Sequence, residues 1–245
     1  MHSKIKNKMR YTLFVLIVFF AITGCSSDTE TMNITGSVQG LKRGTLLLQK
    51  FEDTLLVTVD SIVVDGNSEF KFSQKVESPE IYYLYVQLKD GTLRDDRITF
   101  FGENGDINIQ TNLKKFGSAA RVSGSRNDSL LNNYNKLKQR YISKNLDLIE
   151  KELKAKTKKN DSLATELAQK QNALLSSKYF ATINFALTHK DYEVSPYLIL
   201  SEAHNSKLKY LDTVYNSLSQ KVKDSKYGKE LESLIKDKKE IDTLL

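Results

Sequence analysis

The sequence is poor in the residues that carry redox and metal chemistry. Its 245 residues include one Cys, three His, two Pro and no Trp. A single thiol cannot close an intramolecular disulfide or form a Cys-x-x-Cys couple, and a thiolate zinc site needs three or four ligands. We therefore expect no metal site and no cofactor. With 40% hydrophobic and 27% charged residues, the chain is neither collagen-like nor of low complexity, which predicts one or two globular domains.

Catalytic motifs are missing as well. His189 and His204 are the only histidines beyond the N-terminal segment, and neither belongs to an HExxH pattern. The chain holds no Gly-x-Ser-x-Gly elbow and no Gly-x-x-x-x-Gly-Lys phosphate loop. Adjacent acids such as Asp95 and Asp96 point apart on a strand or loop, so they do not form a dyad that shares a proton. The sequence predicts no catalytic residue and a protein that is not an enzyme, with histidines that face solvent or cap helices.

The N-terminal segment has the layout of an export signal. Four basic residues lie within residues 1–10, and residues 11–22 are an almost unbroken apolar run. Twelve helical residues span roughly 18 Å, well short of a hydrocarbon core of about 30 Å. The sequence ITGC, which ends at Cys25, resembles a bacterial lipobox. We expect residues 1–24 to be a lipoprotein signal peptide, Cys25 to carry the lipid that anchors the protein in a membrane, and residues 25–32 to be a polar tether.

The charge of the chain is ordinary once that segment is set aside. The formal net charge of +7 includes four basic residues of the segment 1–10, which has no acidic residue, so the mature chain carries +3. Elsewhere Lys and Glu are interleaved, as in residues 150–159. This pattern is typical of solvated helix faces with i,i+4 ion pairs, whereas nucleic-acid binding needs a basic stripe. We expect no nucleic-acid partner.

Residues 33–125 show short apolar runs separated by turn residues, a pattern typical of strands. Gly66 and Gly105 fall between such runs and are able to take the positive φ that a tight hairpin demands. Strands without intervening helices predict an antiparallel β-sandwich or barrel-like domain. The expected strands are 34–38, 45–51, 56–64, 69–76, 81–88, 98–101, 107–110 and 120–122.

The expected strand 81–88 is apolar on both faces. Tyr82 and Leu84 lie on one face, while Tyr83 and Tyr85 lie on the other. We favour a central strand that is covered on both sides, because large aromatic side chains are usually buried. The alternative is that Tyr83 and Tyr85 form an exposed aromatic patch, a binding surface for a glycan or a partner strand.

Residues 126–245 change to helical spacing. Leu130, Tyr134, Leu137 and Tyr141 recur at 4-3-4, which predicts one long amphipathic helix. Further helices are expected to begin at the Asn160-Asp161 cap and at Ser195-Pro196, and to cover 207–222 and 225–245. The predicted fold class is α+β, with the β domain first and an all-α region after it.

These segments together carry a family resemblance. The sequence resembles the uncharacterised DUF4369-type domain found at the N-terminus of Bacteroidetes lipoproteins, in which a thioredoxin-like domain of the AhpC/TSA class follows. The resemblance rests on ITGSV at 34–38, VDS at 59–61, DG at 65–66, FKF at 70–72, VSGS at 122–125, and the segments 185–203 and 225–235. The Trp-Cys-x-x-Cys motif of such thioredoxin domains has no counterpart here, so no catalytic residue carries over.

The expected function is that of a non-enzymatic binding or accessory module in the cell envelope. A lipid on Cys25 would hold the protein at the outer membrane, and the β domain would present its surface to a protein or glycan partner. The alternative is a docking partner for a separate thioredoxin-like protein, in place of the domain that is fused in the related lipoproteins. A hydrolase built on His189, His204 and scattered carboxylates is a third hypothesis.

Overall fold

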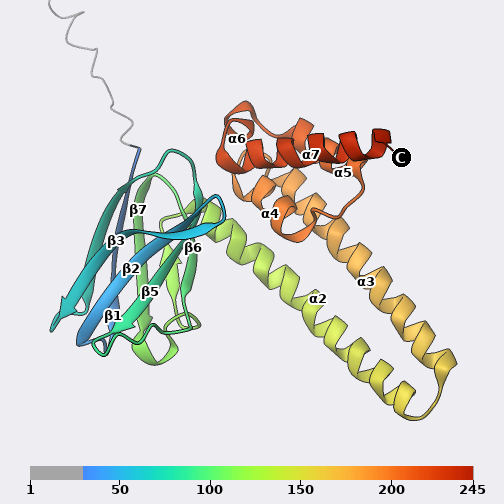
Figure 1. Ribbon diagram of the computed structural model, residues 1–245, viewed down its shortest axis with the longest axis horizontal. Coiled ribbons are helices and arrows are strands. Elements are labelled where there is room, and N and C mark those ends of the chain that lie inside the picture. The colour runs from blue at the N-terminus through green and yellow to red at the C-terminus, as the bar shows by residue number, and fades with distance from the viewer. Residues whose placement is uncertain (1–29, 245) are drawn as a thin grey trace, which may run out of the picture.

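The computed structural model describes residues 30–244, so the predicted signal peptide and Cys25 lie outside the described part of the chain. Figure 1 shows a β-sandwich and a helical arm that diverge from a common joint. Strands come first along the chain and helices follow, which confirms the predicted α+β class. Within residues 30–244, no helix is both long enough and apolar enough to cross a membrane.

The sandwich contains two four-stranded sheets, ordered β4-β1-β7-β8 and β3-β2-β5-β6. Each strand overlaps one of the expected strands. Along β1, buried and exposed positions alternate, and Met32, Ile34 and Val38 pack between the sheets against Phe72 and Phe100. The strands are β1 (Thr31–Gln39), β2 (Arg43–Glu52), β3 (Leu55–Asp65), β4 (Glu69–Lys75), β5 (Glu80–Leu88), β6 (Ile98–Gly102), β7 (Gly105–Asn112) and β8 (Arg121–Ser123).

One strand pair and two turns differ from the expected antiparallel hairpins. β1 pairs with β7 in parallel, with Ile34 opposite Ile107. Gly66 and Gly105 do take positive φ values of 90° and 114°. They connect β3 to β4 and β6 to β7, however, and these strands belong to different sheets. A glycine turn reverses the chain, but it does not decide whether the flanking strands hydrogen-bond to each other or pack face to face.

The helical arm begins with two long helices that form an antiparallel hairpin (Figure 1). The predicted cap of the second helix is confirmed, because the Asn160 side chain accepts a hydrogen bond from the backbone N–H of Leu163. Shorter helices pack around the end of the hairpin nearest the sandwich. The helices are α2 (Arg126–Thr157), α3 (Asp161–Thr188), α4 (Val194–Glu202), α5 (Leu208–Ser217), α6 (Gln220–Lys223) and α7 (Lys226–Leu244), and a short 3-10 helix, η1 (Leu113–Lys115), precedes β8.

Two helix boundaries differ from the expectation. The predicted helix 207–222 is interrupted at Leu218, where ψ is 143°, and the chain resumes as α6. The break allows Val214, Leu218 and Val222 to enter the same core. Ser195 is not a cap: α4 begins one residue earlier, and the Ser195 hydroxyl donates to the carbonyl of His189 at 2.6 Å.

The joint between the arms combines apolar packing with buried hydrogen bonds. Ile81 and Phe101, from β5 and β6, pack against α2, α4 and α7. The backbone N–H of Phe101 donates to Asp128 Oδ1, and that of Ile81 donates to the Tyr227 hydroxyl, each at 3.0 Å. Asn127 is also buried there and accepts from the backbone N–H of residue 194 at 2.9 Å. These directional bonds fix how the helical arm leaves the sandwich.

Candidate binding cleft

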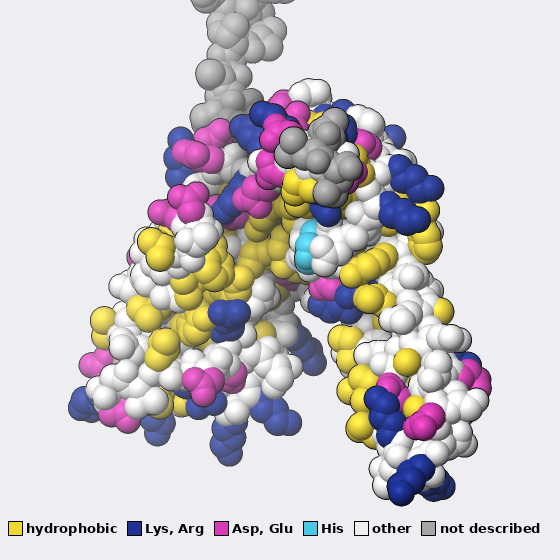
Figure 2. All heavy atoms as spheres, turned by 45° about the vertical axis from the view of Figure 1, so that its right-hand side comes forward, with side chains coloured by type: hydrophobic (Ala, Val, Ile, Leu, Met, Phe, Trp, Pro, Cys, Tyr) yellow, Lys and Arg dark blue, Asp and Glu magenta, His cyan; other side chains and the backbone are white. Residues whose placement is uncertain are grey.

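The two arms border an open space, which we call the notch. Ile81 and Phe101 lie on the outer face of sheet β3-β2-β5-β6 and touch the helices, so the rest of this face lies beside the notch. Figure 2 shows hydrophobic side chains gathered over the sandwich next to the opening and along the edge of the helical arm that borders it. The notch therefore has an apolar wall on each side.

Tyr83 and Tyr85 lie on this outer face, but they do not form an exposed platform. Tyr85 is only 7% exposed, and Tyr83 is half-buried. The Arg97 guanidinium lies 4.4 Å from the centre of the Tyr83 ring, and its Nη1 donates to the Tyr85 hydroxyl at 2.7 Å. Burial raises the pKa of Tyr83 more than the cation of Arg97 lowers it. The expected burial is confirmed for Tyr85, while Tyr83 is half-buried under Arg97, so the two rings do not form an open aromatic patch.

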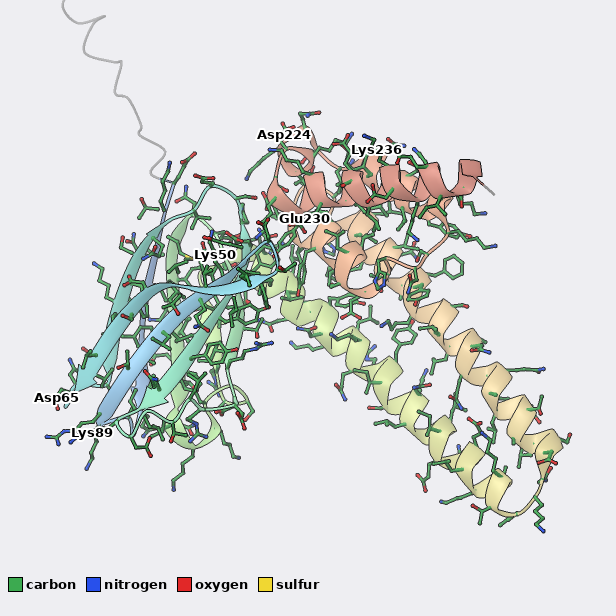
Figure 3. The ribbon with its side chains drawn as sticks, viewed as in Figure 1. Lys50, Asp65, Lys89, Asp224, Glu230 and Lys236 are labelled. Atoms are coloured by element: carbon green, nitrogen blue, oxygen red, sulfur yellow. The ribbon has the colours of Figure 1, made fainter. Side chains whose placement is uncertain are left out.

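The exposed apolar surface of the face comes from other residues. Val63 on β3 is 76% exposed, and Phe51 and Leu56 are partly exposed beside each other on β2 and β3. In Figure 3, Lys50 marks the end of the face at the joint, and Asp65 and Lys89 mark the far end. The sheet therefore offers aliphatic and aromatic side chains along its outer face.

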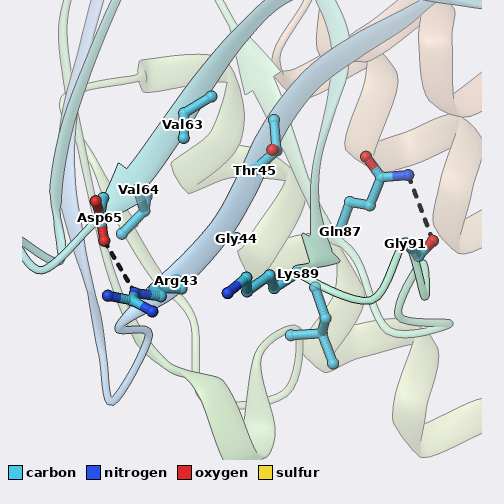
Figure 4. A pocket seen from close by; sticks show the side chains of 10 residues that line it. Arg43, Gly44, Thr45, Val63, Val64, Asp65, Gln87, Lys89 and Gly91 are labelled. Carbon is cyan, nitrogen blue, oxygen red and sulfur yellow. Dashed lines mark hydrogen bonds and ion pairs between the residues drawn. The ribbon is translucent and has the colours of Figure 1, made fainter.

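A shallow pocket of about 430 Å³ lies at that far end (Figure 4). Three of its polar side chains have partners: Arg43 Nε contacts Asp65 Oδ1 at 3.1 Å, and the Gln87 amide donates to the Gly91 carbonyl at 3.4 Å. Both members of the ion pair are exposed, so water and salt weaken their interaction. The pocket is a continuation of the outer face, and its lining residues do not form a cluster of reactive groups.

The α2–α3 hairpin carries a second apolar stripe. Leu148 packs in the small core between the helices. A separate set of apolar residues follows a 4-3-4 spacing along α2, which places them on one face of the helix: Ile142, Leu146, Ile149 and Leu153. Ile142, Leu146 and Leu153 of this stripe are exposed to solvent, and Leu146 is 60% exposed. Leu175 of α3 shares a pocket of about 330 Å³ with Ile142, so both helices contribute apolar atoms to this surface.

A small cavity, which we call the vertex cavity, lies where the sandwich meets α2 and α4. Its volume is about 200 Å³. The floor contains the buried residues Leu131 and Leu198, and most of the remaining lining is polar. The polar lining residues are Thr99 from β6, Asp128, Asn132, Asn135 and Lys138 from α2, and Tyr197, Ser201 and Glu202 from α4.

The two carboxyl groups of the vertex cavity have pKa values shifted in opposite directions. Burial raises the pKa of Asp128, although it accepts hydrogen bonds from the Phe101 backbone and Asn132. Burial also acts to raise the pKa of Glu202, but hydrogen bonds from Lys138 and Lys178, at 2.8 and 2.9 Å, outweigh it and lower that pKa. Burial raises the pKa of Tyr197 to about 12, so this phenol stays neutral at physiological pH.

The histidines have structural environments. His189 is the C-cap residue of α3, its ring lies 4.2 Å from that of Phe185, and its Nδ1 lies 2.8 Å from the Phe185 carbonyl oxygen. His204 is exposed after α4. The expectation of capping and solvent-facing roles is confirmed. Within residues 30–244, no three His, Cys, Asp or Glu side chains gather closely enough to hold a metal ion.

Comparison with known proteins identifies the β-rich part of the chain. Residues 32–131 match the family model described as "Domain of unknown function (DUF4369)". The described sandwich is therefore similar to the DUF4369 domain, over less than half of the chain. The match runs from β1 into the first turns of α2, and it confirms the resemblance expected from the sequence, whereas the association with thioredoxin-like lipoproteins stays a prediction.

Other comparisons add little to the DUF4369 match. No curated protein matches the chain. A solved structure named "pT26-6p" matches at 12% sequence identity with a TM-score of 0.23, and the match covers 80% of this chain and 42% of that one. The chain thus spans less than half the length of that protein, and a TM-score at this level supports no inference about fold or function.

The sequence did not point to the residues that line the vertex cavity. Asn132, Asn135 and Lys138 read as ordinary exposed positions of an amphipathic helix. A spacing of three between them places all three on one side of α2. This spacing was the one feature of the sequence that could have indicated a shared polar site. Arg97 was also missed, because its place over Tyr83 depends on how the chain folds back between β5 and β6.

Proposed function

We propose that this protein is a membrane-anchored, non-enzymatic binding module of the cell envelope that holds a protein partner in the notch. The observation that carries the proposal is that both walls of the notch present large apolar side chains that are exposed to solvent. Contiguous exposed apolar surface of this kind is uncommon on monomeric proteins and marks interaction sites.

The chemistry of the walls favours a polypeptide over a glycan. Val63, Leu146 and Leu175 are aliphatic, and they complement apolar side chains of another protein. A glycan bound along the sheet would need open aromatic rings, but Arg97 covers Tyr83 and Tyr85 is buried. The wall surface therefore supports a protein as the occupant of the notch.

The predicted lipid fits this use of the notch. In Figure 1, β1 begins at one end of the molecule, and the tip of the α2–α3 hairpin lies at the opposite end. A lipid on Cys25, a few residues before β1, would direct the hairpin tip away from the membrane surface. The notch would then face the periplasm or the exterior, where a protein partner can enter it. Mass spectrometry should find acylated Cys25 at the N-terminus, and a free thiol or a retained signal peptide would contradict the anchor.

Site-specific photo-crosslinking in native envelopes tests the binding proposal. The full chain carries p-benzoyl-phenylalanine in place of Val63 on the sandwich wall, of Leu146 on the helical wall, or of Thr35 on the exposed face of the other sheet as a control. All three positions are exposed, so the label should not disturb folding. We expect positions 63 and 146 to give the same adduct and position 35 to give none. No adduct above background, or an equal adduct from position 35, would refute the proposal.

A further inference from the structure

The vertex cavity has properties that the apolar walls of the notch lack. It is bordered by three elements and is partly open to solvent, and a volume of about 200 Å³ corresponds to about seven water molecules at liquid density. That space suits a single six-membered ring with its substituents and is too small for a folded segment of a partner. Ligand sites favour such positions between domains.

The charges that line the cavity are already balanced inside the protein. Glu202 accepts from Lys138 and Lys178. Asp128 accepts from the Phe101 backbone N–H and from the Asn132 amide. Because each charged side chain has a partner, a ligand need not bring a net charge of either sign. A carboxylate or phosphate would also approach two acidic groups, which is unfavourable.

The polar groups left over are neutral and include both donors and acceptors. The side chains of Asn135 and Thr99 have no hydrogen-bond partner within the described residues, and Asn132 uses only its amino group. An amide and a hydroxyl can each donate and accept, as can the hydroxyl groups of a sugar. The apolar floor formed by Leu131 and Leu198 can contact the C–H groups of such a ring.

We propose that the vertex cavity binds a neutral polyhydroxylated ring, that is, one pyranose unit. Asn135, Asn132 and Thr99 hydrogen-bond its hydroxyl groups, and Leu131 and Leu198 contact one face of the ring. The polar lining of this site distinguishes it from the apolar walls to which we assign the protein partner.

Saturation-transfer-difference NMR on the full chain in detergent micelles tests the assignment. The probes are D-glucose, D-mannose and D-galactose, with D-gluconate as an anionic polyol and L-serine as a zwitterion. We expect signals from the ring protons of at least one pyranose and none from gluconate or serine. Asn135→Leu should weaken that sugar's binding about tenfold, whereas Asn133→Leu, an exposed position on the same helix outside the cavity, should leave it unchanged.

A second variant keeps the test independent of folding. Thr99→Val removes one hydroxyl from an exposed strand position while keeping the β-branched shape, and it should weaken the sugar several-fold. The proposal is overturned if no sugar gives a signal, if gluconate or serine binds more strongly than the sugars, or if Asn135→Leu and Asn133→Leu bind sugar equally. Loss of crosslinking from positions 63 and 146 would instead refute the protein-binding function, so the two failures are distinguishable.

Discussion

Replacing Tyr227 by Phe should measure how strongly one buried hydrogen bond ties the helical arm to the sandwich. Tyr227 lies on α7, and its hydroxyl accepts the backbone N–H of Ile81 on β5 at 3.0 Å. Burial raises the pKa of Tyr227 well above the ordinary tyrosine value, so the phenol is neutral under any practical assay condition. The substitution therefore removes one neutral acceptor.

The expected loss follows from what remains after the hydroxyl is gone. The ring keeps its edge contact with Phe101, at 5.9 Å between centroids, and its contact with Tyr197 at 5.1 Å. The N–H of Ile81 is left buried without an acceptor, which costs about 1–3 kcal/mol of unfolding free energy. Tyr227→Ala would also remove the ring and should cost about 3–5 kcal/mol.

Urea unfolding followed by far-ultraviolet circular dichroism gives these differences directly. The matched control is Tyr210→Phe, because the Tyr210 hydroxyl has no hydrogen bond within the described residues while its ring contacts Phe180 at 5.3 Å. The control should change the unfolding free energy by less than about 0.5 kcal/mol. If Tyr227→Phe matched the control, the hydrogen bond at the joint would contribute nothing, and the account of a fixed joint would be wrong.

Four further substitutions test the packing and the electrostatics. Gly36→Ala places a methyl group 2.0 Å from the Ile109 carbonyl oxygen and should cost about 3 kcal/mol or more, whereas Gly66→Ala, which meets no atom within 4 Å but has φ of +90°, should cost only about 1 kcal/mol. Glu202 has a lowered pKa in the folded protein, so its contribution to stability is lost as the pH falls through that pKa. Glu202→Gln should therefore make the free energy of unfolding depend less on pH in the acidic range. Asp128 has a raised pKa, so stability is lost as the pH rises from the unfolded-state value through the folded-state value, and Asp128→Asn should remove that decline. Chemical unfolding between about pH 3 and pH 7 distinguishes the two signs.

The elements of the fold follow from local patterns, and their pairing does not. Alternation at Ile34 and Val38 was enough to place β1, since one face of a strand must be buried. The predicted tether 25–32 was wrong at its end, because β1 begins at Thr31 and Met32 is fully buried between the sheets. Ile34 and Val38 say nothing about which strand lies beside them. The parallel pairing of β1 with β7 joins segments about seventy residues apart, with Ile34 opposite Ile107, and it depends on how the two sheets stack.

The candidate site was harder to predict for the same reason. Tyr83 and Tyr85 can be recognised from the sequence because their own strand is unusually aromatic, which is a local signal. The vertex cavity combines Thr99, Asn135 and Ser201, which come from three elements, and no short segment contains them together. Their proximity depends on the angle between α2 and the sandwich, which the hydrogen bonds of the joint determine.

That joint also explains why the walls of the notch remain apart. Closing the arms onto each other would bury apolar side chains of the two walls, each worth roughly 1.5–3 kcal/mol when an exposed side chain becomes fully buried. It would also break the bonds of Phe101 to Asp128 and of Ile81 to Tyr227, and every buried group left unpaired costs about 1–3 kcal/mol. The gain is therefore offset by losses of similar size. A partner of the kind we propose would cover the same apolar side chains and leave the joint intact, so the proposed binding would avoid this loss.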